Sequence, residues 1–137
     1  MFLLDTNVVS ELRKPKPHGA VLAWLQGVDD AQLFISAMTV AEIQRGIELT
    51  REQDADKAAV LDAWLTELSG HYQIFAADTD VMRQWARLRH RRSDTLTEDA
   101  LIAATAQVHR LTVVTRNVAD FKTFSVPLLN PFEFKAS

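Results

Sequence analysis

Two patterns of hydrophobic and polar positions follow one another along the chain: short apolar runs, and longer segments with helical spacing. The apolar runs lack polar alternation, which is typical of strands buried on both faces of a parallel sheet. They predict strands at residues 2–4, 33–36, 73–75 and 111–114. Residues 126–129 predict an edge strand, because Pro127 cannot donate a hydrogen bond to a neighbouring strand.

The segments between the runs place apolar residues three or four positions apart, which predicts helices. We expect them at residues 8–13, 18–28, 39–50, 55–68, 80–91, 98–109 and 117–121. Thr39 and Glu42 have the spacing of a capping box, Gly70 is expected to stop the fourth helix, and Thr97 is expected to cap the sixth. Because strands and helices alternate, the chain predicts an α/β fold with a mostly parallel central sheet between helices.

Composition narrows the class of protein. A length of 137 residues with 47% hydrophobic and 24% charged residues predicts one globular domain, 1–137. The net charge of −3 excludes a strongly basic nucleic-acid binder, so any polyanion must be met by local basic patches or bound cations. The absence of cysteine excludes disulfides, thiolate catalysis and cysteine zinc sites. Without a membrane-spanning apolar run or a signal peptide, we expect a cytoplasmic protein that contacts no membrane.

Four acidic residues stand where the carboxyl edge of the sheet is expected. Asp5 ends the first strand, and Glu42 lies in the first turn of the helix after the second strand. Asp99 lies in the first turn of a later helix, and Asp120 follows the fourth strand. Each acid alone is also explained as a helix cap, a first-turn charge or a loop residue. Together they predict a site, because ligands of open α/β sheets bind at the carboxyl ends of strands.

Carboxylates gathered at one edge repel one another. Two unit charges about 4 Å apart cost about 4 kcal/mol at an effective dielectric constant of about 20. A helix N-terminus offsets only about 0.3–1 kcal/mol of this. Either one acid is protonated, with a raised pKa, or a divalent cation is bound. Oxygen ligands without histidine or cysteine favour Mg²⁺ or Mn²⁺, and the matching chemistry is phosphodiester hydrolysis by a metal-activated water.

Four blocks of sequence, in order and over nearly the whole chain, resemble the PIN-domain ribonucleases. They are Leu3-Leu4-Asp5-Thr6-Asn7, residues 35–42 with Thr39-Val40-Ala41-Glu42, Asp99-Ala100-Leu101-Ile102-Ala103-Ala104, and residues 113–121 with Val113-Val114-Thr115-Arg116-Asn117. Asn130-Pro131-Phe132 extends the likeness toward the end of the chain. Within this family the chain is most similar to the VapC type, toxins of bacterial toxin–antitoxin pairs, including the branch that holds the FitB proteins.

The resemblance implies a PIN-like three-layer α/β/α sandwich and an endoribonuclease that depends on Mg²⁺ or Mn²⁺. It also implies a homodimer, a higher assembly with antitoxin, and inhibition by a cognate antitoxin whose tail lies over the active site. The implied catalytic and metal-binding acids are Asp5, Glu42, Asp99 and Asp120. The implied polar neighbours that orient ligands or water are Asn7, Ser36, Thr39, Thr115 and Asn117. Some family members carry an acid at the position of Asn117. In this chain Asp120 is expected to serve as the fourth acid instead, either directly or only through a water molecule.

Two further features each have two interpretations. Arg83, Arg87 and Arg91 recur every four residues, either as a solvated helix face or as a rim that contacts RNA phosphates. Trp24, Trp64 and the apolar stripe of residues 61–68 predict core, and a part of them predicts, as the alternative, a groove for an antitoxin helix.

Two other functions compete with the ribonuclease. An aspartyl-phosphate enzyme or phosphoacceptor would use the acid after the first strand as nucleophile. Such sites need a second acid two residues later and a lysine near a later strand, whereas the chain has Asn7 and no lysine in residues 113–116. The other alternative is a catalytically weak PIN-like module that binds RNA or a partner. Mg²⁺-dependent RNA cleavage that EDTA blocks separates the ribonuclease from the binding module.

Overall fold

The structure is a computed structural model that describes residues 1–92 and 95–136. These residues form one five-stranded sheet in the order β3-β2-β1-β4-β5, and each pairing is parallel. The strands are β1 (Phe2–Leu4), β2 (Leu33–Ser36), β3 (Gln73–Phe75), β4 (Thr112–Val114) and β5 (Leu128–Leu129). The α/β fold is confirmed, and β5 lies at an edge as Pro127 predicted.

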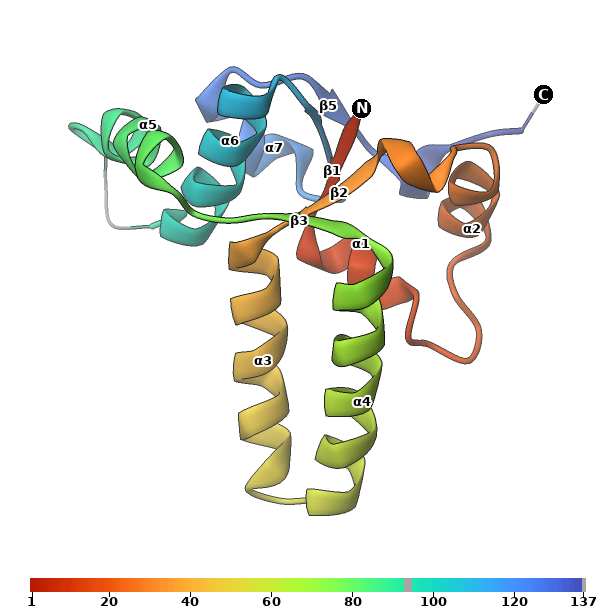
Figure 1. Cartoon of the computed structure of the whole chain (residues 1–137). Helices are drawn as coiled ribbons and strands as arrows, with labels where there is room; N and C mark the ends of the chain where they lie inside the picture. The colour runs from red at the N-terminus through yellow and green to blue at the C-terminus, as the bar shows by residue number, and fades with distance from the viewer. Residues whose placement is uncertain (93–94, 137) are drawn as a thin grey trace.

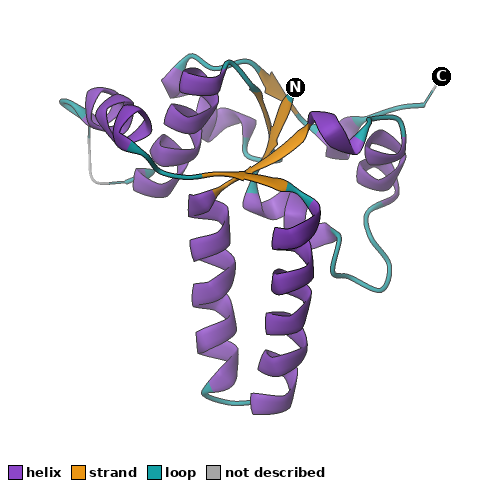
Figure 2. Cartoon of the chain, in the orientation of Figure 1, coloured by secondary structure: helices purple, strands orange, loops and turns teal. Residues whose placement is uncertain are grey.

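Helices cover both faces of this sheet (Figures 1 and 2). They are α1 (Thr6–Glu11), α2 (Gly19–Gln26), α3 (Ala37–Arg51), α4 (Ala55–His71), α5 (Thr79–Arg89), α6 (Thr97–His109) and α7 (Val118–Phe121). Short 3₁₀ turns are η1 (Asp30–Gln32), η2 (Lys122–Phe124) and η3 (Pro131–Glu133). α3 and α4 pack side by side as a hairpin that projects away from the sheet (Figure 1). Within the described ranges, no helix has both the length and the apolar character needed to cross a membrane.

The three central strands send alternate side chains to opposite faces, which gives the sheet two cores. Leu4, Ile35 and Val114 pack in the core that includes residues of α1, α2, α3 and α4. Their strand neighbours, which pack with α6 and α7 in the second core, are Leu3, Phe34 and Val113. Because both faces are covered, these strands read as continuous apolar runs, and the three-layer sandwich is confirmed.

The register of the sheet brings the ends of three strands together. Leu4 pairs with Ile35 on one side and with Val114 on the other. The Asp5 backbone N–H then donates to the Val114 carbonyl at 2.9 Å, which holds the chain just beyond the strand ends. The residues that follow β1, β2 and β4 therefore leave the sheet at the same edge.

The structure corrects three predicted helix ends. Ser36 caps α3 by accepting a hydrogen bond from the Met38 backbone N–H at 3.0 Å, so Thr39 lies inside the helix and is not its cap. Gly70 does not stop α4, which continues to His71, because a glycine costs a helix only about 1 kcal/mol. Thr97 is the first residue of α6 and not its cap; the capping position belongs to Leu96, which has a left-handed backbone (φ 61°) and makes no side-chain cap hydrogen bond.

The prediction that α5 extends to residue 91 was also wrong. α5 ends at Arg89, and Arg91 has a left-handed backbone with φ 62°. Arg83 and Arg87 therefore share a helix, whereas Arg91 lies beyond it. The expected helical stripe of three arginines is broken because the backbone turns before its third member.

Candidate active site

Asp5 is the buried centre of the site, with a side chain fixed by its own segment and by β4. Its Oδ1 accepts a hydrogen bond from the Thr6 backbone N–H at 2.8 Å, so Asp5 caps α1. Its Oδ2 accepts from the Thr115 hydroxyl at 2.7 Å and from Asn7 Nδ2 at 3.2 Å. Burial raises the pKa of Asp5, and the three hydrogen bonds oppose that rise.

Asn7 and Thr115 link this acid to the segment that follows β4. Asn7 Oδ1 accepts from the Arg116 backbone N–H at 3.2 Å, and Thr115 Oγ1 accepts from the Asn117 backbone N–H at 2.9 Å. Each of these two side chains thus bonds both to Asp5 and to the backbone that follows β4. A carboxylate supported in this way keeps one orientation, which favours ligand binding.

Glu42 lies in the second turn of α3, since that helix begins earlier than the sequence predicted. Its Oε1 is buried and has no hydrogen-bond partner among the described residues. Burial, followed by the charge of Asp5, raises the pKa of Glu42 to about 7, although the Thr6 hydroxyl opposes the rise by hydrogen bonding. Glu42 is therefore a partly desolvated acid that faces other negative charge and has an unused ligand atom.

Asp99 is the third residue of α6 and approaches the same place from the other core. Burial raises its pKa to about 6, and the charges of Asp5 and Asp120 add to the shift. Asp99 also acts on Glu42, whose pKa it raises. Asp5, Glu42 and Asp99, which are far apart in the chain, therefore share one electrostatic neighbourhood.

Asp120 and Asn117 lie at the exposed rim of this neighbourhood. Both line a hollow of about 440 Å³ with Arg116, Asn130 and Glu133. The Asn117 side chain makes no cap hydrogen bond with α7, and Asp120 lies in the first turn of that helix. Of the two, Asp120 carries the charge that reaches Asp99.

Ser36 and Thr39 are buried at the start of α3, and their hydroxyls contact the backbone or another hydroxyl. Ser36 Oγ is occupied as the cap of α3. The Thr39 hydroxyl accepts a hydrogen bond from the Thr6 hydroxyl at 3.2 Å, and Thr6 is also the group that lowers the pKa of Glu42. Thr39 therefore contacts Thr6, a neighbour of the acids, rather than an acid itself.

The sequence analysis missed Glu98 and Arg45. Glu98 precedes Asp99, and its charge raises the pKa of both Asp99 and Glu42. Arg45 Nη1 pairs with Glu98 Oε1 at 2.8 Å and so connects α3 to α6 beside the acids. The only local signals were the position of Glu98 in the same first turn as Asp99 and of Arg45 less than one turn after Glu42.

A metal ion would meet a partly built set of ligands here. Among the described residues, no group of three or more acidic, histidine or cysteine side chains is arranged to hold a metal ion as it stands. The unpartnered Oε1 of Glu42 and the raised pKa values of the acids nevertheless fit a missing positive charge. Mg²⁺ suits such a site, because it uses one or two carboxylates and keeps several waters.

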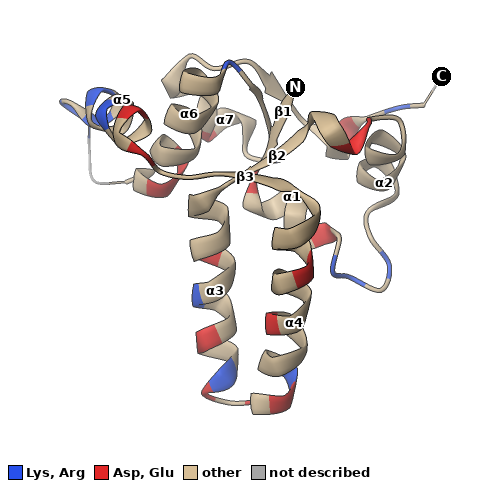
Figure 3. Cartoon of the chain, in the orientation of Figure 1, with Lys and Arg blue, Asp and Glu red and all other residues tan. Residues whose placement is uncertain are grey.

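The sequence left two interpretations open for the apolar stripe of residues 61–68 and two for the arginines on and after α5. The surroundings of the acids bear on both features. Leu61 and Trp64 are half-buried, and with Arg13 they line a cavity of about 300 Å³ that includes Glu42. They also pack against the core, which agrees with the core interpretation, whereas the groove for an antitoxin helix stays a prediction. The basic positions lie on and after α5, where Figure 3 shows Lys and Arg gathered. Arg83, Arg87 and Arg91 are all exposed, as either interpretation of the arginines requires.

Known proteins match this chain over nearly its whole length. The model of the PIN domain family matches residues 2–125. Toxin FitB of Neisseria gonorrhoeae is 33% identical over 96% of this chain and 99% of its own length. The VapC ribonuclease Y4jK of Sinorhizobium fredii is 35% identical over 97% of this chain and 99% of its own length.

Solved structures agree with the sequence matches. FitAB bound to an IR36 DNA fragment has a TM-score of 0.82 at 33% identity, with 99% of both chains covered. FitAcB from Neisseria gonorrhoeae has a TM-score of 0.80 at 36% identity, with 98% of this chain and 100% of that chain covered. The chain therefore belongs to the PIN-domain family, in the group of the VapC and FitB toxins.

Proposed function

We propose that the chain is an endoribonuclease that depends on Mg²⁺ or Mn²⁺ and is the toxin of a toxin–antitoxin pair. The observation that carries this proposal is the shared neighbourhood of Asp5, Glu42 and Asp99 at the carboxyl edge of the sheet. The relatives named a toxin and a VapC ribonuclease support the same activity. They also favour it over an aspartyl-phosphate enzyme.

Each acid has a role in this proposal. Asp5 and Asp99 hold the principal metal ion, and Glu42 and Asp120 complete its shell or hold a second ion. When bound, the ion lowers the pKa of a water and offsets negative charge on the scissile phosphate. Asn7 and Thr115 act as positioning residues, because their hydrogen bonds fix Oδ2 of Asp5.

The partner in this proposal is an antitoxin protein that covers the acids. Relatives solved as FitAB, as FitAcB and as a toxin–antitoxin complex from Klebsiella pneumoniae support such a partner. The cavity lined by Leu61 and Trp64 beside Glu42 would receive an apolar face of its helix. We also propose a homodimer that forms a higher assembly with the antitoxin.

Cleavage of a long RNA by the purified protein in Mg²⁺, Mn²⁺ or EDTA tests the proposal. We expect cleavage with either metal ion, none in EDTA, and a loss of at least roughly a hundredfold in Asp5→Asn. Asparagine is as good a helix cap as aspartate, so this variant should stay folded. Asp54→Asn is the matched control, because Asp54 caps α4 at the remote end of the hairpin.

Two results would contradict the proposal. Cleavage that persists in EDTA would show that the reaction does not need a metal ion. Wild-type rates in Asp5→Asn would show that the acidic site does not catalyse it. RNA binding without cleavage in either metal ion would instead favour the catalytically weak binding module.

A further inference from the structure

Arg116 is an exposed cation at the rim of the acidic site. Its backbone N–H donates to Asn7 Oδ1 at 3.2 Å, and Asn7 Nδ2 donates to Asp5 Oδ2 at 3.2 Å. Arg116 also lines the hollow of about 440 Å³ that contains Asp120. The charge of Asp120 adds to burial and to Asp5 in raising the pKa of Asp99. Arg116 is thus linked to the acids twice, through Asn7 and through Asp120.

The guanidinium of Arg116 is held in place by an aromatic side chain. It lies over the Phe132 ring, with its central carbon 4.7 Å from the ring centroid. Phe132 is itself fixed, because its ring packs against His18 at 5.1 Å between centroids and its backbone N–H donates to Asn130 Oδ1 at 3.0 Å. A contact of this kind engages the face of the guanidinium and leaves the N–H donors along its edge for another ligand.

Within the described residues, Arg116 has no acidic partner, although two acids line the same hollow. Asp120 and Glu133 border this space, yet neither forms an ion pair with the guanidinium. No described residue accepts a hydrogen bond from it either. The charge and the donors of Arg116 are therefore available to a ligand from outside.

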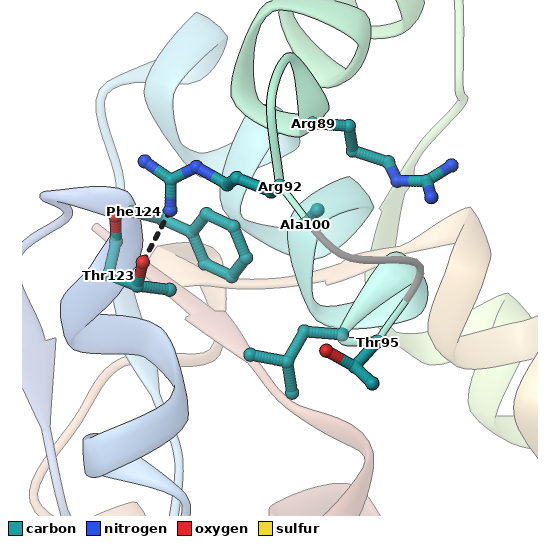
Figure 4. Close-up of a pocket in the computed structure, with 7 residues that line it drawn as sticks. Arg89, Arg92, Thr95, Ala100, Thr123 and Phe124 are labelled. Atoms are coloured by element: carbon teal, nitrogen blue, oxygen red, sulfur yellow. Dashed lines mark hydrogen bonds between the residues drawn. The ribbon is translucent and has the colours of Figure 1, made fainter.

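Two other arginines show what an engaged guanidinium looks like. Arg92 lies over the Phe124 ring, 5.2 Å from its centroid, but its Nη1 also donates to the Thr123 carbonyl at 2.7 Å and to the Thr123 hydroxyl (Figure 4). Arg45, which lies beside the acids, pairs with Glu98 at 2.8 Å. Arg116 has the ring contact of the first and the acidic surroundings of the second, without the partner of either.

A phosphate of an RNA strand has the chemistry that such a cation binds. Arginine holds phosphate through two parallel N–H···O hydrogen bonds, which need free donors along the edge of the guanidinium. A strand that approaches the site carries its negative charge toward Asp5, Glu42 and Asp99. In a chain with a net charge of −3, a cation at the rim offsets this repulsion on phosphates that a metal ion does not reach.

We propose that Arg116 binds the RNA phosphate next to the one that is cleaved. The strand then passes from the acids into the hollow between α7 and η3, where the guanidinium meets it. The inference rests on the proposed function for the identity of the ligand. It adds a substrate-binding residue to the four acids and gives the strand a direction across the site.

RNA binding measured without catalysis tests this role. The protein carries Asp5→Asn and is kept in EDTA, and the probe is a short fluorescein-labelled single-stranded RNA of mixed sequence, followed by anisotropy. Adding Arg116→Gln should weaken binding roughly tenfold, the usual loss for a hydrogen bond between charged groups. The dependence of binding on salt should fall by about one unit of slope, because one phosphate contact is lost.

Two further variants separate a phosphate contact from a structural role. Arg116→Lys keeps the charge but not the paired donors, so the salt dependence should stay unchanged while the affinity falls less than in Arg116→Gln. Arg110→Asn is the matched control, because it removes one exposed arginine at the far end of α6, and asparagine tolerates the left-handed backbone there. Its affinity for RNA should stay unchanged. All variants should unfold at nearly the same urea concentration, since the ring contact of an exposed arginine is weak.

Several results would overturn the proposal: no binding of the RNA by the Asp5→Asn protein, unchanged affinity in Arg116→Gln, or an equal loss in Arg110→Asn. An Arg116→Gln protein that unfolds much more easily would assign the arginine to the packing of Phe132. A changed size on gel filtration would assign it to a contact between copies of the chain. Either outcome would overturn the proposal as well.

RNA cleavage by proteins that keep Asp5 separates this inference from the proposed function. Binding that depends on Arg116, without cleavage in Mg²⁺ or Mn²⁺, refutes only the proposed function. Metal-dependent cleavage together with RNA binding that does not depend on Arg116 refutes only the role of this arginine.

Discussion

The short helix α1 has a buried carboxylate at each end, and the two carboxylates differ in the charge of their partners. At the C-terminal end, Glu11 pairs with the Lys14 ammonium and accepts from the His18 backbone N–H at 2.9 Å. The hydrogen bond from Lys14 lowers the pKa of Glu11. At the other end, Asp5 accepts hydrogen bonds from uncharged donors, including Thr115, and burial raises its pKa.

The difference shows how a structural acid can be told apart from an acid that we propose binds a metal ion. Glu11 has a cation of its own and ties down the loop that carries Pro15 and Pro17. Asp5 lies instead among further acids, so a cation from outside would stabilise its site in the proposed function. Burial alone would not have separated these two residues, because both are almost fully buried.

The largest expected effect is on catalysis. Glu42→Gln should lower Mg²⁺-dependent RNA cleavage by at least roughly a hundredfold, because it removes a charge from the proposed metal shell. Glu11→Gln, the same substitution at the acid paired with Lys14, should keep the wild-type rate per folded molecule. Initial rates on one labelled RNA measure both. Equal losses in the two variants would erase the distinction between the acids.

The second expected effect is on stability, where Glu11→Gln should do more harm than Glu42→Gln. Glu11→Gln should lower the free energy of unfolding by about 1–3 kcal/mol, because the Lys14 ammonium and the His18 N–H lose a charged acceptor. Glu42→Gln in EDTA at neutral pH should unfold at the same or a higher urea concentration, since it removes a partly buried charge. Urea titrations followed by circular dichroism measure both. A larger loss of unfolding free energy in Glu42→Gln than in Glu11→Gln would make Glu42, rather than Glu11, the structural acid.

The third effect is a dependence of stability on pH. The folded-state pKa of Glu42, about 7, lies above its ordinary value of 4.5, so the folded protein binds more protons than the unfolded chain between these values. The free energy of unfolding in EDTA should therefore fall as pH rises from about 4.5 to about 7. Asp99 adds to the fall up to about 6.

Urea titrations in EDTA at several pH values check this slope. Glu42→Gln should flatten it, whereas Glu11→Gln should not, because the pKa of Glu11 is shifted in the other direction. Saturating Mg²⁺ should restore stability at neutral pH in the wild type. If the free energy of unfolding in EDTA rises over this pH range instead, the acids do not raise one another's pKa values.

The smallest expected effect concerns the exposed arginines on and after α5. If they contact RNA, charge reversal at Arg87 and Arg91 should weaken RNA binding and lower its dependence on salt by about one unit of slope per lost phosphate contact. Binding by the Asp5→Asn protein at several salt concentrations measures this. Charge reversal at Arg51, in the remote hairpin, is the control. Unchanged binding would leave Arg87 and Arg91 as an ordinary solvated face.

Some parts of the site were predictable because their signals are local. An acid directly after an apolar run, as at Asp5, marks the end of a buried strand whatever follows it. Caps were harder to predict, because Ser36 and Thr39 are both good caps and the choice depends on where the backbone leaves the sheet. Arg45 and Glu98 were missed for a related reason, since they come from different helices and meet only when α3 and α6 pack.

By itself, the sequence determined the alternation of strands and helices, the two-sided burial of the sheet and the identity of the acids. These follow from the spacing of apolar residues and from residue type, which are properties of short segments. Only the tertiary structure decided which carboxylates share a field and which have a cation. That choice depends on contacts such as Thr115 with Asp5, whose partners lie 110 positions apart, and electrostatic energy depends on distance in space rather than along the chain.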